Sequence, residues 1–163
     1  MIVDSSWNAD ETLFFTLRRL VPRMGIDNLI KAMALLKSKG YRCRLVIGGA
    51  GPERERLEQL TRSIDMESSV VFLGKIPDAD LPAFFQAADC FVLPTRALEC
   101  FGLIILESFA SGTPVIATPV GSIPEIMGEV GNSFLTDDAQ PESLARKMAA
   151  FMDKELDYDE AAF

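Results

Sequence analysis

The sequence predicts an α/β domain with a parallel sheet that is covered by helices on both faces. Short apolar segments of strand length alternate along the chain with longer segments of helical pattern, and this alternation is typical of parallel sheets. The 163 residues have the length of one ordinary domain, which is enough to bury a sizeable core. We expect this domain over residues 12–152, with a lead-in segment 1–11 before it and an acidic tail 153–163 after it that is cut short.

The expected elements follow each other in the order strand, helix, strand. The strands are predicted at 12–17, 43–47, 70–73, 90–93, 115–117 and 133–135. The helices are predicted at 26–39, 52–64, 81–88, in the apolar segment after Gly102, near 122–127, and at 141–152. Gly40 ends the first helix and Pro94 ends the fourth strand, as these residue types commonly do. The pattern corresponds to a Rossmann-like three-layer domain.

The composition excludes several classes of function. Lys plus Arg number 16 against 24 Asp plus Glu, and a net charge of −8 argues against nucleic acid as a partner. No histidine is present, so this chain alone builds neither a histidine triad nor a histidine-ligated metal site. The three scattered cysteines have no metal-ligand spacing and suit a reducing, cytoplasmic setting. No apolar run approaches the ~20 residues that span a bilayer.

The distinctive residues of the chain fall in the loops that follow the predicted strands. Arg19 follows the first strand, Gly48–Gly51 the second, Gly74–Ile76 the third, Pro94–Gly102 the fourth and Pro119–Glu125 the fifth. Ligands of open parallel sheets bind at the carboxyl ends of the strands, near the topological switch point. Residues from all five loops therefore meet at one edge and predict one ligand site.

The segment from Glu99 to Ala117 is the most informative part of the sequence. Two glutamates, Glu99 and Glu107, are separated by Cys100-Phe101-Gly102-Leu103-Ile104-Ile105-Leu106. The helix after Gly102 has almost no polar face, and such helices are normally buried. We therefore expect a buried Glu107 with a partner that compensates its charge. Glu99 precedes the helix, where unpaired N–H groups and the helix dipole attract anions.

This segment resembles retaining nucleotide-sugar glycosyltransferases of family 4, which adopt the GT-B fold. The resemblance rests on the E-x7-E run and the following Ala-Ser-Gly-Thr-Pro-Val, and it covers roughly residues 12–150. Further matching motifs are Leu17-Arg18-Arg19-Leu20-Val21-Pro22-Arg23-Met24-Gly25, Ile47-Gly48-Gly49-Ala50-Gly51-Pro52-Glu53-Arg54, Val71-Phe72-Leu73-Gly74-Lys75-Ile76 and Gly121-Ser122-Ile123-Pro124-Glu125. It implies one half of a GT-B fold: the C-terminal, donor-binding domain.

The resemblance implies roles for the residues around the two glutamates. Glu107 would accept hydrogen bonds from both ribose hydroxyls of the donor; the alternative is a structural role, either an ion pair with a nearby arginine or a cap on a neighbouring loop. Glu99 would face the transferred sugar as the catalytic candidate, in an orienting role and not as a base; the alternative is an exposed loop carboxylate. The backbone N–H groups of Phe101, Gly102 and Leu103 would point at the donor phosphate or sugar.

The earlier loops are expected to hold the diphosphate and the base. Arg19 and Arg23 are candidate diphosphate ligands, because guanidinium groups match phosphate oxygens. The family usually has lysine where this chain has Met24, so Arg23 or Arg18 would supply the second cation. Four further candidates lie on the donor side: Gly49 and Gly51 in a tight glycine turn, and Lys75 and Ile76, whose backbone groups would face the base.

Two other features have simpler interpretations. Asp78-Ala79-Asp80 is a D-x-D sequence, but it precedes a helix and is expected to be an N-cap pair and not a metal ligand. Cys100 stands where the family commonly has glycine, and we expect it to be packed within its loop.

The predicted function is donor binding within a glycosyltransferase that transfers a sugar from a nucleotide-diphosphate sugar to an acceptor. No cofactor and no metal are expected. The implied partners are the nucleotide-sugar donor and a missing N-terminal acceptor-binding domain, through which any association with the inner face of a membrane would occur. Without that domain the chain is expected to bind donor but transfer poorly. The alternatives are a stand-alone nucleotide-binding or regulatory module, or a related GT-B sugar-nucleotide epimerase.

Overall fold

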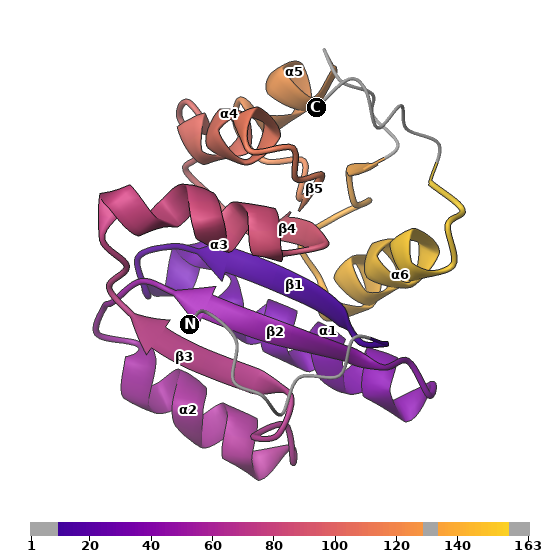
Figure 1. The fold of residues 1–163 in the computed structure, drawn as a ribbon. Coiled ribbons are helices and arrows are strands. Elements are labelled where there is room, and N and C mark those ends of the chain that lie inside the picture. Colours follow the sequence, from indigo (N-terminus) through magenta and orange to yellow (C-terminus); the bar gives the residue numbers. More distant parts are fainter. Residues whose placement is uncertain (1–9, 129–133, 157–163) are drawn as a thin grey trace.

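The computed structural model describes residues 10–128 and 134–156, which form a three-layer α/β arrangement (Figure 1). Five parallel strands form one sheet in the order β3-β2-β1-β4-β5. The strands are β1 (Thr12–Leu17), β2 (Cys43–Gly48), β3 (Val70–Gly74), β4 (Cys90–Leu93) and β5 (Val115–Ala117). The predicted Rossmann-like parallel sheet is confirmed.

Helices connect successive strands and cover both faces of the sheet. They are α1 (Ile26–Ser38), α2 (Arg54–Ser63), α3 (Leu81–Ala87), α4 (Leu103–Ala110), α5 (Ile123–Gly128) and α6 (Pro141–Met152), with short 3-10 helices η1 (Pro22–Met24) and η2 (Asp78–Asp80). In one layer, α1 packs against both α2 and α6. In the other layer, α3 packs against α4 (Figure 1).

The central strand β1 shows how the two layers are held to the sheet. Its interior residues are buried, and because neighbouring side chains point to opposite faces, Phe14 and Phe15 enter different layers. The Phe14 ring lies 6.2 Å from that of Phe151 on α6. The Phe15 ring lies 5.4 Å from that of Phe85 on α3 and 5.7 Å from that of Phe91 on β4. A strand buried on both faces is typical of parallel sheets. The contact between Phe15 and Phe91 also holds β1 against β4, and the candidate site lies at the carboxyl ends of these two strands.

The expected elements agree with the observed ones to within one or two residues at most ends. The β1, β4 and β5 bounds are those expected from the sequence. The expected strand at 133–135 begins outside the described residues; within them, Leu135 forms an isolated parallel bridge with Ala117. The lead-in and the acidic tail fall largely outside the described residues, although the Tyr41 hydroxyl donates to Asp153 Oδ2 at 2.6 Å. Among the residues described, no helix has the length and apolarity needed to cross a membrane.

Candidate functional site

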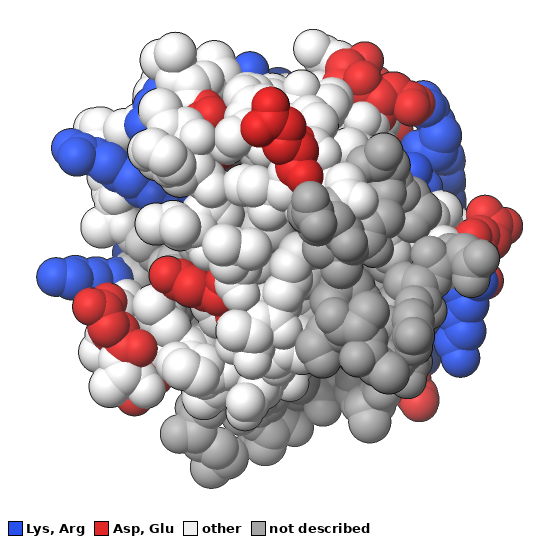
Figure 2. Space-filling model, turned by 90° about the horizontal axis from the view of Figure 1, so that it is seen from above, with Lys and Arg blue, Asp and Glu red and all other residues white. Residues whose placement is uncertain are grey.

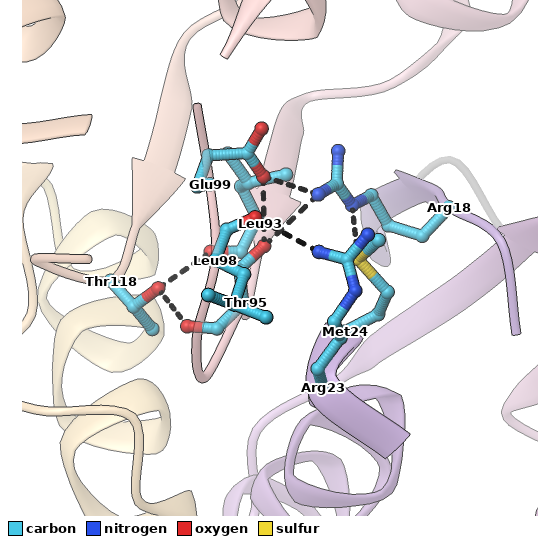
Figure 3. Close-up of polar contacts among 8 residues, drawn as sticks. All are labelled: Arg18, Arg23, Met24, Leu93, Thr95, Leu98, Glu99 and Thr118. Atoms are coloured by element: carbon cyan, nitrogen blue, oxygen red, sulfur yellow. Dashed lines mark hydrogen bonds and ion pairs between the residues drawn. The ribbon is translucent and has the colours of Figure 1, made fainter. Parts of the chain in front are cut away.

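The two central strands, β1 and β4, define the topological switch point of the sheet. From β1 the chain proceeds outward through β2 to β3, and it then returns to β4 and continues to β5 on the other side. Crevices form at such points outside the carboxyl ends of the strands. Arg18 follows β1 and Thr95 and Glu99 follow β4, so all three extend from this point (Figure 3).

An ion pair joins the two sides of the switch point. Arg18 Nη2 donates to Glu99 Oε2, and the two side chains are only 11% and 12% exposed. Arg18 Nη2 also lies 3.3 Å from Thr95 Oγ1, and Arg18 Nε lies 3.2 Å from the sulfur of Met24 (Figure 3). Burial lowers the pKa of the Arg18 guanidinium; the Glu99 charge opposes this shift, and the positive charge of Arg23 adds to it. Glu99 is therefore no exposed loop carboxylate.

The loop after β4 is held in place from both sides. Arg23 Nη1 donates to the Leu98 carbonyl at 2.9 Å, and the Arg96 N–H donates to the Arg23 carbonyl at 2.8 Å. On the other side, the Thr118 hydroxyl donates to the Thr95 carbonyl at 2.6 Å (Figure 3). These bonds fix the backbone that carries Glu99.

The glycine turn after β2 is shaped by close backbone contacts. A Cβ atom on Gly49 would lie 1.9 Å from the Arg18 carbonyl oxygen, and one on Gly51 would lie 2.4 Å from the Leu20 carbonyl oxygen. The Gly49 N–H also donates to the Gly74 carbonyl at 2.7 Å. Gly49 and Gly51 thus allow the loops after β1, β2 and β3 to touch, as the sequence predicted for a tight turn at this edge.

The cations of the first loop face solvent. Arg19 and Arg23 are exposed, and together with Val21 and Pro22 they line an open pocket of about 450 Å³. Lys75 is also exposed, whereas Ile76 is buried and its side chain packs against Gly48. The arginines are thus available to a ligand at this edge, and Ile76 could offer only its backbone.

The N-terminus of α4 is open. Gly102, with φ of +54°, occupies the N-cap position, and no described side chain caps the helix. Phe101 and Leu103 on either side of it are 75% and 64% exposed. The first N–H groups of α4 therefore remain available as donors at the positive end of the helix dipole.

The structure corrects the expectation that Glu107 is buried. Glu107 is exposed, and its carboxylate has no hydrogen bond or ion pair within the described residues. The reason is that α4 buries only Ile105 and Ser108, while Leu103 and Leu106 face outward. Figure 2, the view from above, shows a largely uncharged surface in which the Lys and Arg side chains lie toward the margins. An apolar helix was therefore mistaken for a buried one, and the structural ion pair considered for Glu107 is absent from the described part of the chain.

Of two smaller expectations, the one for Cys100 was wrong and the one for Asp78 and Asp80 holds only in part. Cys100 is exposed and not packed within its loop, because the loop lies on the surface ahead of α4. Asp78–Asp80 forms the 3-10 helix η2; Asp80 occupies the N-cap position of α3 as expected, but no side-chain hydrogen bond caps that helix. Asp80 already has helical backbone angles, φ −93° and ψ −17°, which do not aim its side chain at the next N–H groups. Within residues 10–128 and 134–156, no group of three or more Cys, Asp or Glu is placed to hold a metal ion.

Sequence reasoning missed the supporting contacts of the site. Thr95 and Thr118 are fully buried and connect the loops after β4 and β5. Arg96 Nη2 forms an ion pair with Asp27 Oδ2 at 2.8 Å, which ties the loop after β4 to the start of α1. Their only signal in the sequence is a position directly after a predicted strand or at the start of a predicted helix.

The fold and this edge define a Rossmann-like α/β domain with a cationic candidate ligand site at its switch point. Residues 2–162 match the family described as glycosyl transferases group 1, and the chain belongs to this family. The similar solved structures are glycosyltransferases of the GT-B fold, which agrees with the resemblance seen in the sequence.

Three similar proteins illustrate the relationship. A GDP-mannose-dependent alpha-(1-6)-phosphatidylinositol monomannoside mannosyltransferase of Mycobacterium tuberculosis is 32% identical over 89% of this chain and 38% of its own length. HepE of Anabaena, in complex with UDP and glucose, is 26% identical with a TM-score of 0.79, over 94% of this chain and 41% of that one. The C-terminal domain of the group 1 glycosyl transferase LpcC from Francisella tularensis is 26% identical with a TM-score of 0.74, over 90% of this chain and 78% of that one. The chain spans about a third of the length of the curated relatives it matches.

Proposed function

We propose that this chain is the donor-binding half of a retaining glycosyltransferase and binds a nucleotide-diphosphate sugar at its switch point. One observation carries the proposal: Arg18 and Arg23 bond to the loop that carries Glu99 and leads into the open N-terminus of α4, and Arg19 shares a pocket with Arg23. Guanidinium groups and free helix N–H groups are the usual donors to phosphate oxygens. The HepE structure, which contains UDP and glucose, supports a ligand of this class.

The proposed roles follow the two ends of such a ligand. Arg19 and Arg23 bind the diphosphate, together with the backbone N–H groups of Phe101, Gly102 and Leu103. Glu107, exposed on the second turn of α4, accepts hydrogen bonds from the ribose hydroxyls. Glu99 orients the transferred sugar and stabilises charge in the transition state.

The remaining contacts concern the base and the acceptor. Gly49 and Gly51 shape the donor side of the edge, and the backbone of Lys75 and Ile76 faces the base. The acceptor is bound by an N-terminal domain outside this chain, so the chain alone binds donor and transfers sugar poorly. No metal ion takes part in donor binding.

Calorimetry with UDP, GDP, ADP and their sugar conjugates tests this function. At least one of these ligands should bind with a dissociation constant below about 1 mM. If none does, the chain has no donor site of its own and the proposal fails.

A substitution at Glu107 tests the ribose contact. Glu107→Gln keeps the shape but loses the charge, and it should weaken nucleotide binding by roughly 1–2 kcal/mol, or about 5–30-fold. Because Glu107 is exposed, stability should change by less than about 0.5 kcal/mol. The control Glu142→Gln removes the same charge from α6 and should leave affinity unchanged.

A 2′-deoxyribose ligand completes this test. It should bind the unsubstituted chain more weakly, and Glu107→Gln should reduce that penalty because the carboxylate that reads the hydroxyl is gone. Equal discrimination against the deoxy ligand by both proteins would show that Glu107 does not contact the ribose.

A further inference from the structure

Arg18 is a half-buried cation whose hydrogen-bonding capacity is only partly used by the described residues. The guanidinium has five N–H donors. Its Nη2 serves Thr95 and Glu99, and its Nε faces the thioether of Met24, a weak acceptor. Its Nη1 has no hydrogen-bond partner among the described residues. Within residues 10–128 and 134–156, one nitrogen of a side chain that is 11% exposed thus has no protein partner.

The charges around this nitrogen favour an anion. Figure 3 shows the guanidinium groups of Arg18 and Arg23 side by side, facing the loop that carries Glu99. Arg19 shares an open pocket with Arg23. Within this group, Glu99 is the carboxylate that pairs with Arg18, so three positive charges stand against one negative charge. The excess is local, because the whole chain carries a net charge of −8.

The contact with Glu99 is made through one nitrogen and one carboxylate oxygen, Nη2 to Oε2. A guanidinium can bind two anions at once, because its donors diverge in a planar fork. An anion at Nη1 therefore does not require Arg18 to release Glu99. A second anion held by the same cation would in turn be placed at a defined position relative to Glu99.

We propose that Arg18 bridges Glu99 and the donor diphosphate, with Nη2 on the carboxylate and Nη1 on a phosphate oxygen. This inference rests on the proposed function and assigns to it a specific positioning residue. It gives Arg18 two tasks: it holds Glu99 in place when the site is empty, and it fixes the diphosphate next to Glu99 when the donor is bound.

The experiment compares ligands with different numbers of phosphates. The nucleoside diphosphate that binds most tightly among UDP, GDP and ADP is titrated with its monophosphate and its nucleoside. Arg18→Met should weaken diphosphate binding by about tenfold or more and leave nucleoside binding unchanged. Arg42→Met is the matched control, because it removes the same charge just before β2, at the opposite edge of the sheet. This control should bind all three ligands as the unsubstituted chain does.

Glu99 provides a readout that a purely structural role for Arg18 would not give. Glu99→Gln removes the negative charge that partly neutralises Arg18, and diphosphate binding should therefore strengthen severalfold. In Arg18→Met that gain should disappear. Thermal unfolding of each variant is measured beside the titrations, and Arg18→Met/Glu99→Gln keeps the test usable if Arg18→Met alone is unstable, because it leaves no unpaired buried charge.

The outcomes separate the two proposals. If no nucleoside diphosphate binds the unsubstituted chain, the donor-binding function itself fails. If the diphosphate binds, but Arg18→Met and the double variant bind it as well as the chain does, donor binding stands and the bridging role is wrong. A loss that affects nucleoside and diphosphate equally also overturns the bridge, because it indicates a general distortion of the site.

Discussion

Substituting Gly49 by alanine should destabilise the domain more than the same change at another glycine with a left-handed backbone. Gly49 has φ of +111°, and its added Cβ would lie 1.9 Å from the Arg18 carbonyl oxygen. Gly40 has φ of +85°, yet nothing lies within 4 Å of its added Cβ. The comparison therefore separates backbone strain, which both positions share, from collision, which only Gly49 suffers.

The magnitude follows from these two contributions. Strain at a positive φ costs about 1–3 kcal/mol in either variant. At Gly49 the collision can be relieved only by moving the backbone of Gly49 or of Arg18. Each of these residues donates a backbone hydrogen bond, Gly49 to the Gly74 carbonyl at 2.7 Å and Arg18 to the Gly48 carbonyl at 3.2 Å. Leaving one such buried group unpaired costs about 1–3 kcal/mol more. We expect Gly49→Ala to lose about 2–6 kcal/mol of unfolding free energy, against about 1–3 kcal/mol for Gly40→Ala.

Urea unfolding followed by circular dichroism measures both losses. The slope of unfolding free energy against urea concentration should be the same in both variants and the unsubstituted chain, which shows that all three unfold in the same kind of transition. Equal losses, within about 0.5 kcal/mol, would refute the argument that the contact with Arg18 limits position 49. Because the collision involves the residue that carries the ion pair with Glu99, Gly49→Ala should also weaken diphosphate binding, whereas Gly40→Ala should not.

Three further predictions concern the core, the thiols and the metal. Phe15→Ala should cost about 3–5 kcal/mol of unfolding free energy, whereas Phe101→Ala, at a ring that is 75% exposed, should cost less than about 0.5 kcal/mol. Ellman's reagent should modify only Cys100 in the folded chain and all three thiols after denaturation. Burial raises the pKa of Cys43 to about 11 and also raises that of Cys90, so their contribution to stability should be complete below about pH 9 and fall as the pH rises toward 11. EDTA should leave nucleotide affinity unchanged in calorimetry, and an affinity that depends on added Mg²⁺ or Mn²⁺ would contradict the metal-free site.

The fold could be predicted from the sequence because each buried strand is marked locally. Apolar segments such as Thr12–Leu17 have the length of a strand and are followed by helical patterns, and parallel order follows from that alternation. The edge at which the motifs gather could be predicted for the same reason, since it follows from chain direction alone.

Side-chain contacts at the site could not be predicted in the same way. The pair of Arg18 and Glu99 depends on how two loops meet, which no local pattern encodes. The exposure of Glu107 was predicted wrongly because apolar content says whether a helix has an apolar face, not whether the fold supplies enough surface to cover it. Only Ile105 and Ser108 of α4 are buried, since the helix lies toward the end of the sheet beside β5.

The sequence separation of the two central strands has a consequence for folding. Arg18 and Glu99 are 81 residues apart in the chain, and during synthesis the residues of β2, β3 and the helices between them are added before β4 is available to pair with β1. Contacts that close such long loops form late and slow folding. During synthesis the ion pair can form only after the loop beyond β4 has left the ribosome. Affinity for an anion at the switch point would therefore indicate that the chain from β1 to the loop after β4 has folded, and partly folded chains would not compete for the ligand.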